Sequence, residues 1–211
     1  KGGDLYDRTK EQQFRLKFNL GSQINDYNYI KAGIEYSYFD LYMWQWKDWP
    51  GYPGNTFEFM YDRQPKQYGA YVQDQITFQN MIANIGLRLD YYDGGGGGWP
   101  MGDMWAEEAW MGLDDATIEA EVLPMLRDGQ SWIWNQLDNY AAENPGFYED
   151  IKSYLVISPR LGASFPVTER SKIYFNYGHF RSTVPFSAMY LNKYRQASKN
   201  LIMELGNPNL E

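Results

Sequence analysis

Apolar and polar residues alternate along six long segments of the chain, and this pattern predicts β-strands with one apolar and one polar face. In Ile82–Tyr92, the odd-numbered residues from 83 to 89 are all apolar, whereas the even-numbered residues from 84 to 90 are polar or glycine. The same split recurs in five other segments: Gln13–Gln23, Tyr29–Tyr42, Gln67–Phe78, Tyr154–Phe165 and Lys172–Phe180. The pattern is poorest in Gln67–Phe78, where Asp74 falls among the apolar residues.

The length of these segments separates two classes of sheet. Strands of soluble proteins usually have about 5–6 residues, whereas a strand that crosses a bilayer at a tilt needs about 9–11. The segments are therefore typical of transmembrane strands. A large soluble antiparallel sheet with one wet face is the alternative.

The connections between the segments alternate in length. Short polar turns are expected at Ile24–Asn28, Gln79–Met81 and Thr168–Ser171, and long excursions at Met43–Pro65, Asp93–Lys152 and from Arg181 onward. Short turns at one end and long loops at the other are typical of outer-membrane barrels. We therefore predict an all-β fold: an antiparallel, up-and-down transmembrane β-barrel segment of about six long strands, forming an incomplete barrel, with short helices in one long extracellular loop.

Composition and charge narrow the function further. The chain has 211 residues, a net charge of −8, no Cys and one His, which excludes a disulfide framework, a thiolate metal site and a Cys nucleophile. The acidic balance argues against nucleic acid as a partner. No serine-hydrolase motif, His pair or phosphate-binding loop is present, so no enzymatic activity, no catalytic residue and no cofactor is predicted.

The long loop at residues 94–152 differs from the rest of the chain. It carries 12 acids and 2 bases, whereas the remaining residues carry 15 acids and 17 bases. Gly94–Gly98 should be flexible. Asp114 or Asp115 can cap a helix that Pro124 ends or kinks, and Ser131 can cap a second helix. This loop could be a lid, a ligand site or a partner surface, and a metal site within it is left open.

Several phrases together resemble the barrel of TonB-dependent outer-membrane receptors. They are Tyr68–Gln75, Asn84–Tyr91, Ile157–Ser164 followed by Lys172–Gly178, then Pro185-Phe186 and the closing Gly206–Glu211. The resemblance covers most of residues 1–211 outside the acidic loop. It implies a barrel in the outer membrane of a Gram-negative bacterium, in contact with lipid, that imports a scarce nutrient such as a metal chelate, a cofactor or an oligosaccharide. The alternatives are a passive porin or surface adhesin barrel, and a soluble β-sheet binding module.

The resemblance also implies partners: a small nutrient ligand, a plug domain with the remaining barrel strands, and TonB, which would act through an N-terminal region. We expect the plug, that region and the other strands to lie outside this chain. Charged residues on the polar faces would line the lumen, or would simply hydrate it and pair with one another or with the plug; they are Arg15, Lys17, Lys31, Glu35, Arg88, Asp90 and Arg160. Loop aromatics could stack on a ligand or pack within the loops; they are Trp44, Trp46, Trp49, Trp99, Trp105 and Trp110.

Overall fold

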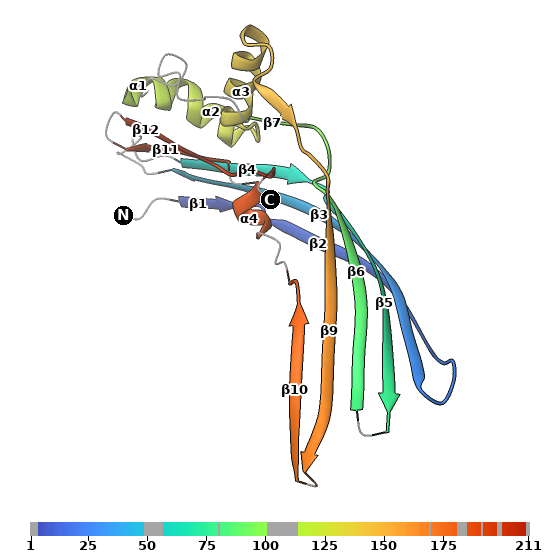
Figure 1. Cartoon of the computed structure of the whole chain (residues 1–211). Coiled ribbons are helices and arrows are strands. Elements are labelled where there is room, and N and C mark those ends of the chain that lie inside the picture. Colours follow the sequence, from blue (N-terminus) through green and yellow to red (C-terminus); the bar gives the residue numbers. More distant parts are fainter. Residues whose placement is uncertain are drawn as a thin grey trace.

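Most of the chain forms one curved antiparallel sheet. The computed structural model describes residues 4–48, 57–79, 81–100, 114–168, 170–180, 185–190, 192–197 and 200–209. Six long strands carry the sheet: β2 (Lys10–Gln23), β3 (Asn28–Asp48), β5 (Lys66–Phe78), β6 (Met81–Asp93), β9 (Tyr154–Thr168) and β10 (Ser171–Gly178). Figure 1 shows them side by side, with the three tight turns at the bottom and the long connections at the top.

Shorter strands extend the upper part of the sheet. They are β1 (Asp4–Asp7), β4 (Phe57–Arg63), β11 (Asn192–Ala197) and β12 (Asn200–Leu205). The strand order is β10-β9-β6-β5-β3-β4-β11-β12, with β1 and β2 paired to the other edge of β3. All these pairings are antiparallel. The path does not close among the described residues, so the prediction of an open, up-and-down β-barrel segment is confirmed.

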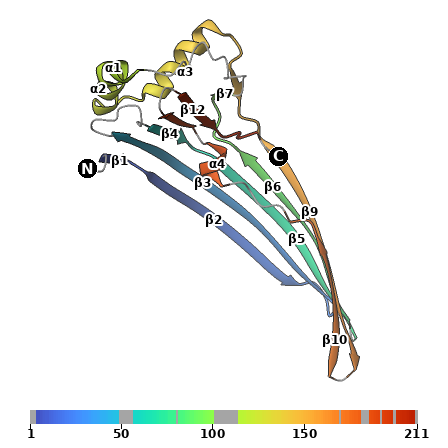
Figure 2. The same cartoon turned by 90° about the vertical axis from the view of Figure 1, so that its left-hand side faces the viewer.

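The top of the molecule carries the remaining elements. A separate ribbon pairs β7 (Gly98–Pro100) with β8 (Tyr148–Asp150). The helices are α1 (Asp115–Thr117), the π-helix η2 (Ile118–Val122), α2 (Leu123–Arg127), α3 (Trp132–Glu143) and α4 (Phe186–Met189). Viewed from the side, the lower sheet is a single curved layer (Figure 2). No helix in the described part of the chain is both long and apolar enough to cross a membrane.

The prediction of a long loop from Met43 to Pro65 was wrong for part of its length. The second predicted strand continues to Asp48, and Phe57–Arg63 returns beside it as β4. The alternation was hard to recognise here because large side chains occupy both faces. Trp44 and Trp46 are buried on one face and Leu41 on the other. This part of the sheet is covered on both sides, so neither face needs to be polar.

The helical segment follows its capping residues closely. The Asp114 side chain accepts a hydrogen bond of 2.7 Å from the backbone N–H of Thr117 at the start of α1, and Ser131 caps α3 through the N–H of Trp134. Pro124 does not end the helix: helical backbone continues from Asp115 to Arg127, and Pro124 stands in the first turn of α2, directly after the π-helical turn η2. The π-helical turn η2 joins α1 to α2.

Candidate functional site

One face of the sheet is continuous, apolar and uncovered. Register places Phe18 of β2 beside Ile34 of β3, Ala70 of β5 beside both Ile34 and Leu89 of β6, and Leu89 beside Ile157 of β9. Ile34 lies in a strand paired on both edges, yet its side chain is 63% exposed. Large exposed apolar patches mark surfaces that meet another apolar phase. This face has the character of a wall that contacts lipid.

Aromatic rows mark the two ends of the apolar face. At the upper end, Tyr36, Tyr68 and Tyr91 lie next to one another across three strands, with ring centroids 5.1 and 6.0 Å apart. At the turn end, Tyr27 lies 5.8 Å from Phe78. The ten residue steps from Tyr68 to Phe78 span about 33 Å along the strand, or about 23 Å at a tilt of about 45°. This height agrees with the apolar band of about 25 Å in transmembrane barrels.

The opposite face carries the charged residues, and four of them form a chain of ion pairs across three strands. Arg88 donates to both carboxylate oxygens of Asp90 at 2.6–2.9 Å and lies 3.8 Å from Glu35. Glu35 in turn lies 3.3 Å from Arg15, which also donates to the Ser37 hydroxyl. The chain of contacts runs from β2 through β3 to β6 and passes over β5.

Glycines on the polar face make room for these crossings. Gly69 of β5 stands between Glu35 and Asp90, and a Cβ built there would come within 2.8 Å of Nη2 of Arg88. Gly33 of β3 similarly lies under the contact between Tyr71 and Asn19. A glycine weakens an isolated strand. Here its missing side chain lets polar groups two strands apart meet.

All seven predicted charged residues lie on this polar face, since the pairing aligns odd positions of β2 and β3 with even positions of β6 and β9. Arg15, Glu35, Arg88 and Asp90 are joined in the ion-pair chain. Lys17, Lys31 and Arg160 have no carboxylate oxygen within 4.0 Å in the described part of the protein. The Lys31 ammonium lies 5.3 Å from the ring centre of Tyr29.

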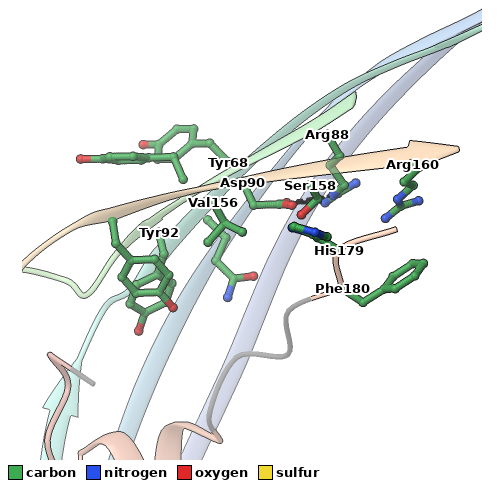
Figure 3. Close-up of a pocket in the computed structure, with 12 residues that line it drawn as sticks. Tyr68, Arg88, Asp90, Tyr92, Val156, Ser158, Arg160, His179 and Phe180 are labelled. Carbon is green, nitrogen blue, oxygen red and sulfur yellow. Dashed lines mark hydrogen bonds and ion pairs between the residues drawn. The ribbon is translucent and has the colours of Figure 1, made fainter. Parts of the chain in front are cut away.

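A cavity of about 380 Å³ opens on the polar face next to the ion-pair chain. Figure 3 shows Arg88, Asp90, Ser158 and Arg160 reaching toward it from β6 and β9. His179 and Phe180, which follow β10, also line it. The sequence analysis did not select these last residues, since their approach depends on how the chain leaves β10. We call this feature the polar-face cavity.

The upper end of the polar face is closed by α4. Phe186 lies 4.8 Å from Phe39 between ring centroids, and Met189 and Tyr190 are buried in the same cluster. The Tyr190 hydroxyl donates to the carbonyl of Gly94 and lies 2.8 Å from the Tyr92 hydroxyl. Burial is the main cause that raises the pKa of Tyr190 to about 12. The two phenols hold the β6 end against α4.

Arg63, the last residue of β4, holds the glycine run Gly94–Gly98 in place. Its guanidinium donates to the carbonyl of Gly96 at 3.3 Å and to that of Gly98 at 3.0 Å. It also lies over the rings of Trp99 and Trp134, at 5.2 and 5.9 Å from their centres. Burial lowers the pKa of Arg63, although nearby tyrosines and Asp62 oppose this shift.

We expected Gly94–Gly98 to be flexible, and the structure gives this segment one specific turn around Arg63. Gly95, Gly96 and Gly97 have φ angles of +85°, +67° and +75°, a region that favours glycine. A Cβ on Gly95 would come within 2.9 Å of the Gln64 backbone. These backbone angles and the close approach to Gln64 explain why the turn uses glycine.

The helical part of the acidic loop packs on the other side of the upper sheet. Its apolar residues form a cluster with Trp44 and Trp46. Glu58 of β4 is buried there and accepts hydrogen bonds from the indole N–H of Trp44 at 3.1 Å and the backbone N–H of Ile133 at 3.0 Å. Desolvation by burial raises the pKa of Glu58, against the opposing effect of these hydrogen bonds.

The described tryptophans of the predicted ligand-contact set pack inside the protein. Trp44, Trp46 and Trp99 are 4%, 3% and 0% exposed. Of the two alternatives, stacking on a ligand or packing within the loops, these three side chains show packing, and none of them offers a free ring face. Trp49, Trp105 and Trp110 lie outside the described residues. Within the described ranges, no group of three His, Asp or Glu side chains is arranged to hold a metal ion.

A one-layer wall with a bare apolar face, aromatic ends and a charged opposite face defines an outer-membrane-type β-barrel protein. Comparison with known families gives the same class. Residues 1–211 match the family described as TonB dependent receptor-like, beta-barrel. The chain therefore belongs to the TonB-dependent receptor β-barrel family, whose members are outer-membrane nutrient transporters of Gram-negative bacteria. Neither the curated proteins nor the solved structures contain a match.

Proposed function

We propose that this chain forms part of the wall of an outer-membrane receptor that imports a scarce nutrient, such as a metal chelate, a cofactor or an oligosaccharide, with energy delivered through TonB. Membership of the receptor barrel family supports the transport role. The two-faced sheet carries the rest of the proposal. Ile34 is bare on one side, while its neighbour Glu35 joins an ion-pair chain on the other.

The polar face supplies the surface along which a nutrient and a plug would lie. Arg15, Glu35, Arg88 and Asp90 neutralise one another across the strands, which keeps the wall wet without leaving strong local charge. The cations without a nearby carboxylate, Lys17, Lys31 and Arg160, would then interact with the lumen contents. The apolar face would contact the acyl chains of the outer membrane.

The experiment is growth of a deletion strain on single candidate nutrients, restored with the full-length gene that encodes this chain. The proposal expects growth on one scarce nutrient that depends on both the gene and an intact TonB. Growth that is restored equally without TonB would support a passive porin instead. A strain whose uptake of every candidate is unchanged by the deletion, but which loses surface attachment, would support an adhesin.

A further inference from the structure

The polar-face cavity contains a cation that forms no ion pair with the described part of the wall. The Arg160 guanidinium is exposed, and in the described part of the chain it has no carboxylate oxygen within 4.0 Å. Its neighbour Arg88 is held by three hydrogen bonds to Asp90. The wall therefore neutralises one of the two arginines at this cavity and leaves the charge of the other available.

An aromatic ring lies beside this free charge. Phe180 is 79% exposed, and the guanidinium of Arg160 lies 5.4 Å from its ring centre. Figure 3 shows both side chains at the same end of the cavity. A cation within about 6 Å of an aromatic ring centre is attracted to the electron-rich face of the ring, which favours one orientation of the guanidinium. The pair thus presents a flat apolar surface and a directed positive charge together.

His179 and Ser158 add polar groups to the lining of the cavity. His179 is held by a 2.8 Å hydrogen bond between its Nε2 and the Tyr177 hydroxyl, and its backbone N–H donates to the carbonyl of Pro159. Ser158 is buried at the cavity wall. The volume of about 380 Å³ falls in the usual range for small-ligand sites, about 300–1,000 Å³.

We infer that the polar-face cavity binds an anionic group attached to a flat ring, with Arg160 pairing the anion and Phe180 stacking on the ring. This inference rests on the proposed function, because it makes this face the ligand-bearing side of the wall. Arg160 can donate two parallel hydrogen bonds to a phosphate or carboxylate. Of the three nutrient kinds proposed above, an anionic cofactor or chelate with aromatic groups fits this surface, and a neutral oligosaccharide does not.

The test is a ligand-observed NMR titration of the purified full-length receptor in detergent with three small probes. Phenyl phosphate has both a ring and an anion, inorganic phosphate has only the anion, and benzyl alcohol has only the ring. The inference expects phenyl phosphate to bind at least tenfold more tightly than either other probe. Arg160→Gln should weaken its binding about tenfold or more, Arg160→Lys by less, and Phe180→Leu by about two- to tenfold.

Lys172→Gln provides the matched control. Lys172 lies on the same face, at the turn end of β10, and has no carboxylate oxygen within 4.0 Å among the described residues. It does not line the cavity, so its substitution should change binding less than twofold. Equal losses in Lys172→Gln and Arg160→Gln, or equal affinity for phenyl phosphate and inorganic phosphate, would overturn the inference.

Chemical labelling of a cysteine variant tests the proposed function separately from this inference. Lys17→Cys should react with a membrane-impermeant thiol reagent if the polar face is the wet side of the wall. Reaction at Lys17→Cys without phenyl phosphate binding would overturn the cavity inference alone. Reaction at Phe18→Cys, on the opposite face of β2, without reaction at Lys17→Cys would contradict the assignment of the lumen itself.

Discussion

The Tyr71 hydroxyl donates a hydrogen bond of 2.9 Å to Oδ1 of Asn19 across an intervening strand. The residue beneath this contact is Gly33, and a Cβ built on it would lie 2.5 Å from a ring carbon of Tyr71 and 2.9 Å from the Phe18 carbonyl oxygen. The contact is possible because β3 has no side chain at this point. The polar face is therefore organised by residues that contribute space as well as by those that contribute charge.

Gly33→Ala should lower the stability of the barrel by about 1–3 kcal/mol, since the added methyl overpacks a site bounded partly by backbone. Gly86→Ala is the matched control, because a Cβ there meets its nearest atom, the Val72 carbonyl oxygen, only at 3.3 Å. The measurement is the melting temperature of the full-length receptor in detergent. A Gly86→Ala receptor that melts as low as Gly33→Ala would contradict the packing explanation.

Arg63→Gln should loosen the turn at Gly94–Gly98, since it removes the charged donor that holds the carbonyls of Gly96 and Gly98. Backbone amide hydrogen exchange in this segment should become about tenfold faster or more, because hydrogen bonds to charged groups are the stronger ones. Exchange followed by mass spectrometry on the intact receptor measures this directly.

Arg127→Gln controls for the loss of an arginine. Arg127 is an exposed arginine whose ion pair with Asp48, 2.6 Å long, is of the surface type that contributes about 1 kcal/mol or less. It should leave exchange at Gly94–Gly98 unchanged. Slow exchange in Arg63→Gln would show that the glycine turn is held by something other than this side chain.

Glu58→Gln should detach the first turn of α3 from the sheet. The carboxylate accepts from both the Trp44 indole and the Ile133 backbone, and an amide keeps only one accepting oxygen while turning an NH2 toward the other donor. The cost should be about 1–3 kcal/mol, visible as faster exchange at residues 132–134. Asp114→Asn, which preserves an exposed cap, should leave those residues unaffected.

The stability contributed by Glu58 should depend on pH with a definite sign. Burial raises the pKa of this carboxyl above 4.5 in the folded loop. Its contribution is therefore fully present below pH 4.5 and declines as the pH rises through the raised value. The wild-type receptor should lose stability across that interval by more than Glu58→Gln does, as measured by tryptophan fluorescence during unfolding. An equal pH dependence in both proteins would show that other acids of the loop cause it.

The membrane-spanning part of the fold was predictable because one physical requirement governs it. Each strand there must offer apolar side chains to one medium and polar side chains to another, so neighbours such as Ile34 and Glu35 carry the information directly. Asp74 departs from this rule on β5, where the Asn28 amide donates to one of its carboxylate oxygens at 2.6 Å. The alternation in a single sequence does not reveal such a pair, because its members are 46 residues apart.

The upper part of the molecule was less predictable for a different reason. Both faces of β3 and β4 are covered there, so Glu58 is buried although its position in the sequence looks like that of a solvent-facing residue. Arg63 likewise organises a glycine run more than 30 residues away. Tertiary contacts of this range decide the loop structure, and hydrophobic periodicity does not encode them.

The most direct test of the account compares two adjacent residues on β2 in the full-length receptor embedded in lipid. A nitroxide label on Phe18→Cys should collide mainly with dissolved oxygen, which concentrates among acyl chains, and a label on Lys17→Cys mainly with a water-soluble nickel chelate. The account predicts this opposite preference at the two neighbouring sites. Labels that both avoid oxygen, or a reversed preference, would contradict a wall with lipid on its apolar face.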